Sequence, residues 1–107
     1  MAIERIAPRE LARRIAVGEP FVLLDVREPA ECSVCQLAGS INIPLGELGR
    51  RHGELDRSAR IVCICHHGVR SSHAASALQR LGFEFLLNLA GGIDRWATDV
   101  DPQMSRY

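Results

Sequence analysis

The residues with the clearest chemical potential lie in one short segment, Cys65-His66-His67-Gly68-Val69-Arg70. Cys65 directly follows the apolar run 61–64 (IVCI), and a helical pattern begins at Ser71. A loop between a buried strand and a helix can curl so that its backbone N–H groups point inward, where the positive end of the helix dipole reinforces them. We therefore expect residues 65–70 to form a small amide-lined cup with the Cys65 sulfur at its centre.

Two neighbours of Cys65 favour its thiolate form. Gly68 can adopt backbone conformations that other residues resist, and Arg70 carries a charge that persists at any working pH. A thiol beside a helix N-terminus and an arginine loses its proton readily, and the thiolate is the nucleophile. The alternative is that Cys65 is simply a buried strand cysteine, which is common in folded proteins.

Two reactions suit a cysteine in an anion-binding cup. The thiolate could accept a sulfane sulfur, with the N–H groups stabilising the persulfide, or it could attack the phosphorus of a bound phosphate ester. Only four residues separate Cys65 from Arg70, and a phosphate or arsenate with three oxygens needs a wider ring of donors than one terminal sulfur does. The short loop favours sulfur transfer over a phosphatase or arsenate reductase. A non-catalytic module that docks a partner is the third possibility.

The elements around this loop alternate between strands and helices. Buried strands are expected at the apolar runs 21–26, 61–64 and 85–89, and short strands at 3–6 and 41–43. Helices are expected at 8–16, around 45–51, at 71–81 and after Gly91-Gly92, with a helical turn within 28–35. The alternation predicts an α/β fold with a central, mostly parallel sheet of about five strands and helices on both faces. Sites in such folds lie beyond the carboxyl ends of the strands, where Cys65 falls.

The composition narrows the class of protein. The 107 residues fit one domain, residues 1–107, with a core at about 5–98 and a C-terminal tail at 99–107. Thirteen basic side chains balance thirteen acidic ones, so neither nucleic acid nor a membrane is an expected partner. No apolar run approaches the roughly 18–20 residues of a membrane span, and the first residues lack a signal-peptide pattern, so a cytoplasmic location is expected. Every basic side chain is arginine; the lack of lysine excludes lysine Schiff bases and the P-loop motif.

Four segments occur in order along the chain: 25–31 (DVREPAE), 39–45 (GSINIPL), 65–71 (CHHGVRS) and 91–96 (GGIDRW). They resemble the corresponding segments of the single-domain rhodaneses, a family of sulfurtransferases, and the resemblance extends over about residues 5–98. Related cysteine phosphatases have an active-site loop that is longer by one residue. The chain departs from the family at 35–39, where CQLAG replaces the common Gly-His-Ile-Pro-Gly, so the shape of the pocket rim stays open.

The resemblance implies a ping-pong reaction at Cys65, which would take sulfur from a donor such as thiosulfate, become a persulfide and pass the sulfur to an acceptor. Cyanide or a thiol would be the small acceptor, and a sulfur-carrier or thioredoxin-like protein the cellular partner. No metal or organic cofactor is implied. The substrate-binding loop would comprise His66, His67, Gly68, Val69, Arg70 and Ser71. Either histidine could tune the entrance or simply face solvent, and Val69 is expected to pack within the loop.

Three charged residues could support this loop. Asp25 could orient it or only cap the next turn. Arg27 could bind the anionic donor or form a pair on the surface. Glu31 could pair with Arg70 and fix its direction, as the phosphatase relatives suggest, or make an ordinary surface pair that contributes little to stability.

The spacing Cys32-x-x-Cys35 admits a redox role. Either thiol could act as a resolving cysteine by attacking a persulfide or sulfenate on Cys65. The same spacing is half of a zinc site, but Cys63 and Cys65 are only one residue apart and do not supply the other half. We therefore expect no metal.

Overall fold

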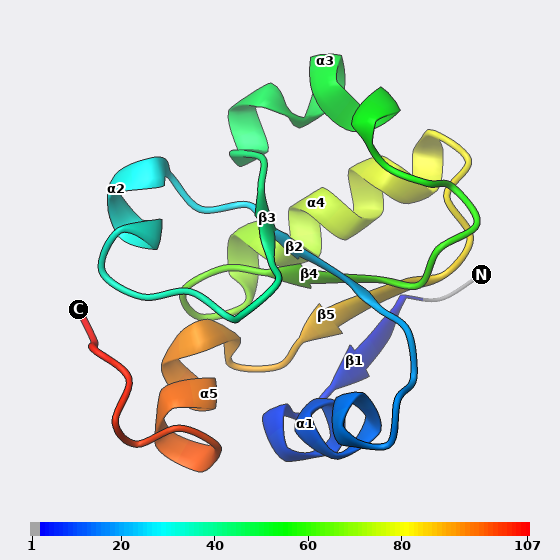
Figure 1. Cartoon of the computed structure of the whole chain (residues 1–107). Helices are drawn as coiled ribbons and strands as arrows, with labels where there is room; N and C mark the ends of the chain where they lie inside the picture. Colours follow the sequence, from blue (N-terminus) through cyan, green and yellow to red (C-terminus); the bar gives the residue numbers. More distant parts are fainter. Residues whose placement is uncertain (1–2) are drawn as a thin grey trace.

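Five parallel strands form one sheet in the computed structural model, which describes residues 3–107. They are β1 (Glu4–Ile6), β2 (Val22–Asp25), β3 (Ile41–Asn42), β4 (Ile61–Ile64) and β5 (Leu86–Leu89). Their order across the sheet is β1-β5-β4-β2-β3, and each neighbouring pair is parallel (Figure 1). The predicted α/β fold is therefore confirmed, with a sheet that is parallel throughout.

Helices cover both faces of this sheet. On one face lie α1 (Pro8–Ala16) and α5 (Gly92–Asp99), and on the other lie α3 (Leu48–Arg51) and α4 (Val69–Arg80) (Figure 1). Successive side chains of β4 point to opposite faces, as the pleat of a strand requires. Ile61 and Cys63 join the core under α4, whereas Val62 and Ile64 join the core under α1 and α5. A strand that is apolar on both faces, as IVCI is, suits this central position.

Two helices differ from their predicted boundaries. The helix expected at 45–51 is divided into a 3-10 turn η1 (Leu45–Glu47), the short α3 and a second 3-10 turn η2 (His52–Glu54). Glycines at 46, 49 and 53 explain the division, since glycine weakens a continuous helix. The main helix α4 begins at Val69 instead of Ser71, because Gly68 turns the chain at a φ of 104° directly before it. Val69 and Arg70 therefore belong to the first turn of α4 and not to a loop.

No helix within residues 3–107 is long and apolar enough to cross a membrane.

Candidate active site

The segment after β4 curls back on its own cysteine. The N–H group of Gly68 donates a hydrogen bond to Cys65 Sγ over 3.0 Å. Helix geometry leaves the N–H groups of the first turn of α4 without acceptors inside the helix, so they supply positive potential on this side of the sulfur. The combination places the Cys65 thiol at the N-terminus of α4, with one N–H donor directed at the sulfur.

The N-terminus of α5 holds the start of this loop. The N–H groups of Ile93 and Asp94 donate to the carbonyl oxygens of Cys65 and His66, over 2.8 and 3.1 Å. Gly92 makes this approach feasible: it has a φ of +65°, and a Cβ there would collide with the carbonyl groups of Cys65 and His66. Segments 65–71 and 91–96, two of the four that resemble the rhodanese family, are thus in direct contact, although they are far apart in sequence.

A polar chain behind the loop contains a residue that the sequence analysis missed. The Ser71 hydroxyl lies 3.2 Å from Cys65 Sγ and donates to Asn88 Oδ1 over 2.5 Å, while Asn88 Nδ2 donates to the Gly68 carbonyl over 3.1 Å. Because the Ser71 proton points to Asn88, the hydroxyl can only accept a bond from the protonated thiol in this arrangement. The available signal was a polar residue inside the apolar run 85–89.

Arg70 does not present a free charge to the cup. Its two terminal nitrogens bind the two carboxylate oxygens of Glu31 over 2.6 and 2.7 Å. Glu31 lies in the short helix α2 (Pro29–Cys32), and its Oε1 also accepts the backbone N–H of Glu28. The hydrogen bonds from Arg70 hold the pKa of Glu31 at about 2, well below its ordinary value of 4.5. This pair ties α2 to the first turn of α4.

We expect the Glu31 pair to make stability depend on pH. Because folding lowers the pKa of Glu31 from 4.5 to about 2, its contribution is fully present above pH 4.5 and is lost as pH falls toward 2. Glu31→Gln should lower the urea midpoint of unfolding at neutral pH. It should also make this midpoint depend less on pH between 4.5 and about 2. Glu84→Gln, at an exposed position that forms no ion pair within residues 3–107, is the control. Equal slopes for Glu31→Gln and wild type would contradict this role.

Asp25 and Arg27 form a buried ion pair at the end of β2. The Arg27 guanidinium is fully buried and binds the Asp25 carboxylate through Nε and through Nη2, the latter over 2.6 Å. It also donates to the carbonyl oxygens of Glu31 and Cys35. The alternative of a surface pair for Arg27 is therefore wrong, because packing of α2 and the following segment over the strand end encloses this side chain. Its N–H groups are directed at protein acceptors instead of at an open site.

The two loop histidines stack on each other, with ring centroids 3.9 Å apart. His67 is exposed, and its Nε2 lies 3.6 Å from an Asp94 carboxylate oxygen. Partial burial lowers the pKa of His66, with the neighbouring His67 adding to the effect. The ligand atoms of His66, His67 and Asp94 lie within 4.8 Å of one another. A zinc ion could accept such donors, but it would compete with Arg106, which binds Asp94 over 2.8 Å.

The sulfur itself is shielded in this conformation. Cys65 is 1% exposed, so the predicted cup is closed above its thiol. Val69, by contrast, is 66% exposed, and the expectation that it packs within the loop is wrong. The reason is that α4 begins at Val69, and the outer side of a first helical turn faces solvent.

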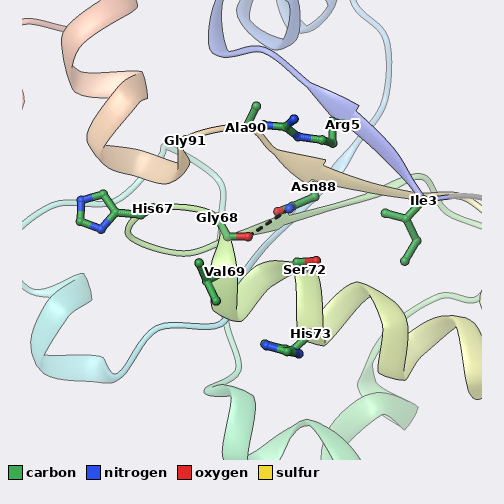
Figure 2. Close-up of a pocket in the computed structure, with 10 residues that line it drawn as sticks. All are labelled: Ile3, Arg5, His67, Gly68, Val69, Ser72, His73, Asn88, Ala90 and Gly91. Carbon is green, nitrogen blue, oxygen red and sulfur yellow. Dashed lines mark hydrogen bonds between the residues drawn. The ribbon is translucent and has the colours of Figure 1, made fainter.

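A pocket of about 490 Å³ lies beside the loop, and Figure 2 shows its lining. Gly68 and Asn88 form its floor, and Arg5 and Ile3 approach from β1 and the residue before it (Figure 2). Cys65 is not among its lining residues. The pocket therefore adjoins the loop without leading to the thiol.

The four cysteines are all free. Cys35 Sγ lies 3.8 Å from Arg27 Nη1, and Cys32 is half-buried near the same ion pair. Burial raises the pKa of Cys32 to about 11, with the Asp25 charge adding to the effect, which disfavours its thiolate at neutral pH. Cys32 is therefore poorly suited to act as a resolving thiol at neutral pH.

The fold and the cysteine loop define a class of protein. A family model for the rhodanese-like domain matches residues 7–99, and the chain belongs to this family. The structure is also similar to that of a rhodanese-related protein from Thermoplasma volcanium, with a TM-score of 0.82 and 35% identity, over 91% of this chain and 93% of that one.

Curated relatives carry names from sulfur chemistry. The chain is 32% identical to a protein of Allochromatium vinosum named sulfurtransferase, over 89% of each. It is 34% identical to the putative sulfur carrier protein YrkF of Bacillus subtilis, over 89% of this chain and 51% of that protein. Relatives at 34% to 35% identity are longer, and the chain spans 24% to 51% of their length. Sulfur transfer is therefore the chemistry found among the relatives of this domain.

Proposed function

We propose that the chain is a sulfurtransferase that moves a sulfane sulfur from thiosulfate, or a related donor, to a thiol or cyanide through a persulfide on Cys65. One observation carries the proposal: the Gly68 N–H group points at Cys65 Sγ from the N-terminus of α4. A terminal persulfide sulfur bears negative charge, and N–H groups already held in place stabilise charge without further reorganisation.

The reaction divides into two displacements at sulfur. The Cys65 thiolate attacks the outer sulfur of thiosulfate, so that a new S–S bond forms, the S–S bond of thiosulfate breaks, and sulfite leaves with the electron pair. The acceptor then attacks the terminal sulfur of the persulfide. Cyanide leaves as thiocyanate, or a thiolate leaves as its own persulfide, and the Cys65 thiolate is restored.

The other features of the proposal follow from this chemistry. The cysteine carries the transferred sulfur covalently, so neither a metal nor an organic cofactor is needed. The name of one relative, a sulfur carrier protein, supports a sulfur-carrier or thioredoxin-like protein as cellular acceptor. Four free thiols suit a reducing compartment, which is why we place the activity in the cytoplasm. We treat residues 1–107 as one domain, with Asp25, Arg27 and Glu31 as positioning residues for the loop.

Intact mass measurement after exposure to thiosulfate tests this function. We expect a reducible gain of one sulfur atom, which peptide mapping assigns to Cys65, and turnover when cyanide is added. An aryl phosphate is the control substrate, and we expect no hydrolysis, because the loop has only four residues between Cys65 and Arg70. Hydrolysis without sulfur uptake would favour a phosphatase. If neither sulfur uptake nor hydrolysis occurs, a binding module would remain as the function.

A further inference from the structure

Tyr107 contacts three of the residues that surround the cysteine loop. Its hydroxyl donates to Glu31 Oε2 over 2.8 Å and accepts from Arg27 Nη1 over 3.0 Å. Its ring stacks on His66, with ring centroids 4.1 Å apart and planes inclined by 16°. One side chain from the last segment of the fold thus joins α2, the end of β2 and the residue next to Cys65.

These contacts place the tyrosine beside the loop, with its ring stacked on the residue that follows Cys65. The rings of Tyr107, His66 and His67 form a continuous stack beside the cysteine loop. The pKa of Arg70 is raised chiefly by its hydrogen bonds to Glu31, and Cys65 and Tyr107 add to the effect. The 1% exposure of Cys65 agrees with a cover of this kind.

The segment that carries Tyr107 is held mainly by side chains. Residues 100–107, which we call the strap, leave α5 and run alongside it toward α2 (Figure 1). Within residues 3–107, no backbone-to-backbone hydrogen bond joins 105–107 to another element. Arg106 pairs with Asp94 near the surface, and pairs of this kind hold a segment weakly. The end of the strap can therefore move while the sheet and its helices stay in place.

We propose that Tyr107 is a gate over Cys65, closed in this structure and opened when residues 105–107 swing away from Glu31 and His66. The gate selects by size: a small anion reaches the sulfur more readily than a tripeptide thiol or a protein acceptor, which needs the open state. The part that concerns acceptors rests on the proposed sulfur transfer. The access of any reagent to the thiol does not, because alkylation needs only contact with the sulfur.

Alkylation of Cys65 in the whole chain, followed by peptide mass spectrometry, tests the gate. Iodoacetamide serves as the small reagent and fluorescein maleimide as the large one. We expect Tyr107→Ala to raise the rate at Cys65 by about tenfold, with a larger increase for the maleimide, since it removes both the stack and the hydrogen bonds. Tyr107→Phe keeps the stack and should lie between. Gln103→Ala, exposed on the same strap, should match wild type.

Two results would overturn the gate. One is an equal rate at Cys65 in Tyr107→Ala and wild type. The other is a parallel rise at Cys63, which is fully buried in β4 and reports loosening of the whole fold. In turnover assays, Tyr107→Ala should lower the KM for reduced glutathione relative to that for cyanide, with little change in kcat. Faster alkylation in a protein that transfers no sulfur would refute the proposed function and leave the gate supported.

Discussion

Cys65→Ser is expected to reduce sulfur transfer by at least about a thousandfold, because removing a covalent nucleophile leaves only binding and orientation to act. A serine oxygen cannot take up sulfane sulfur as the thiolate does. The fold should persist, since the hydroxyl fits the space of the thiol and can accept the Gly68 N–H that now meets Cys65 Sγ. We expect a change in unfolding free energy within about 1 kcal/mol.

The measurement is turnover with thiosulfate and cyanide, together with urea unfolding of the same samples. Cys35→Ser is the matched control, because it makes the same chemical change at a half-exposed cysteine and should keep turnover with cyanide. It also tests the resolving role, since a disulfide between Cys35 and Cys65 after peroxide treatment requires this thiol. Sulfur transfer by Cys65→Ser at the wild-type rate would show that Cys65 is not the nucleophile.

Arg27→Met is expected to destabilise the fold by about 3–5 kcal/mol, because it leaves the Asp25 carboxylate buried without its partner. Asp25 is 1% exposed, and Arg27 binds it through Nε and Nη2. The same guanidinium also binds the Cys35 carbonyl and the Tyr107 hydroxyl, so its loss should loosen the rim of the site as well. A loss of this size is a large part of the stability of a small domain.

Urea unfolding followed by tryptophan fluorescence measures this loss. The double variant Asp25→Asn with Arg27→Met removes both charges and should recover much of the stability, which keeps the test informative if Arg27→Met alone does not fold. Arg13→Met is the control, because its pair with Glu10 is exposed and should contribute about 0–1 kcal/mol. A similar loss for Arg13→Met and Arg27→Met would refute the importance of burial.

Two ion pairs near the loop hold different elements in place. The buried pair of Asp25 and Arg27 fixes the end of β2 and the Cys35 carbonyl, whereas the half-exposed pair of Glu31 and Arg70 links α2 to α4. Both pairs meet at the hydroxyl of Tyr107. Arg27, which the sequence offered as a residue that binds the anionic donor, binds Asp25 and the Cys35 carbonyl in this structure.

The position of the cysteine and the class of fold could be predicted from local sequence alone. The run IVCI followed by Cys65, Gly68 and a helix implies a cysteine at the end of a buried strand, because each of these features depends on residues next to one another. The alternation of apolar runs and helical patterns likewise implies the parallel sheet, since the runs 21–26, 61–64 and 85–89 are typical of strands buried on both faces. Helix α4 begins two residues before the expected Ser71. Glycine at the N-cap can adopt several backbone conformations, and the sequence does not select among them.

Only the tertiary structure determined which distant side chains meet at the loop. Asn88 lies 17 positions from its partner Ser71, and Tyr107 lies 76 positions from its partner Glu31. No local sequence pattern connects the members of either pair. The burial of Arg27 depends in the same way on the segment that folds over the end of β2. Spacing along a chain constrains backbone conformation over about one element, whereas contacts between elements depend on how the whole sheet and its helices pack. That packing also decided that the Cys65 sulfur is buried.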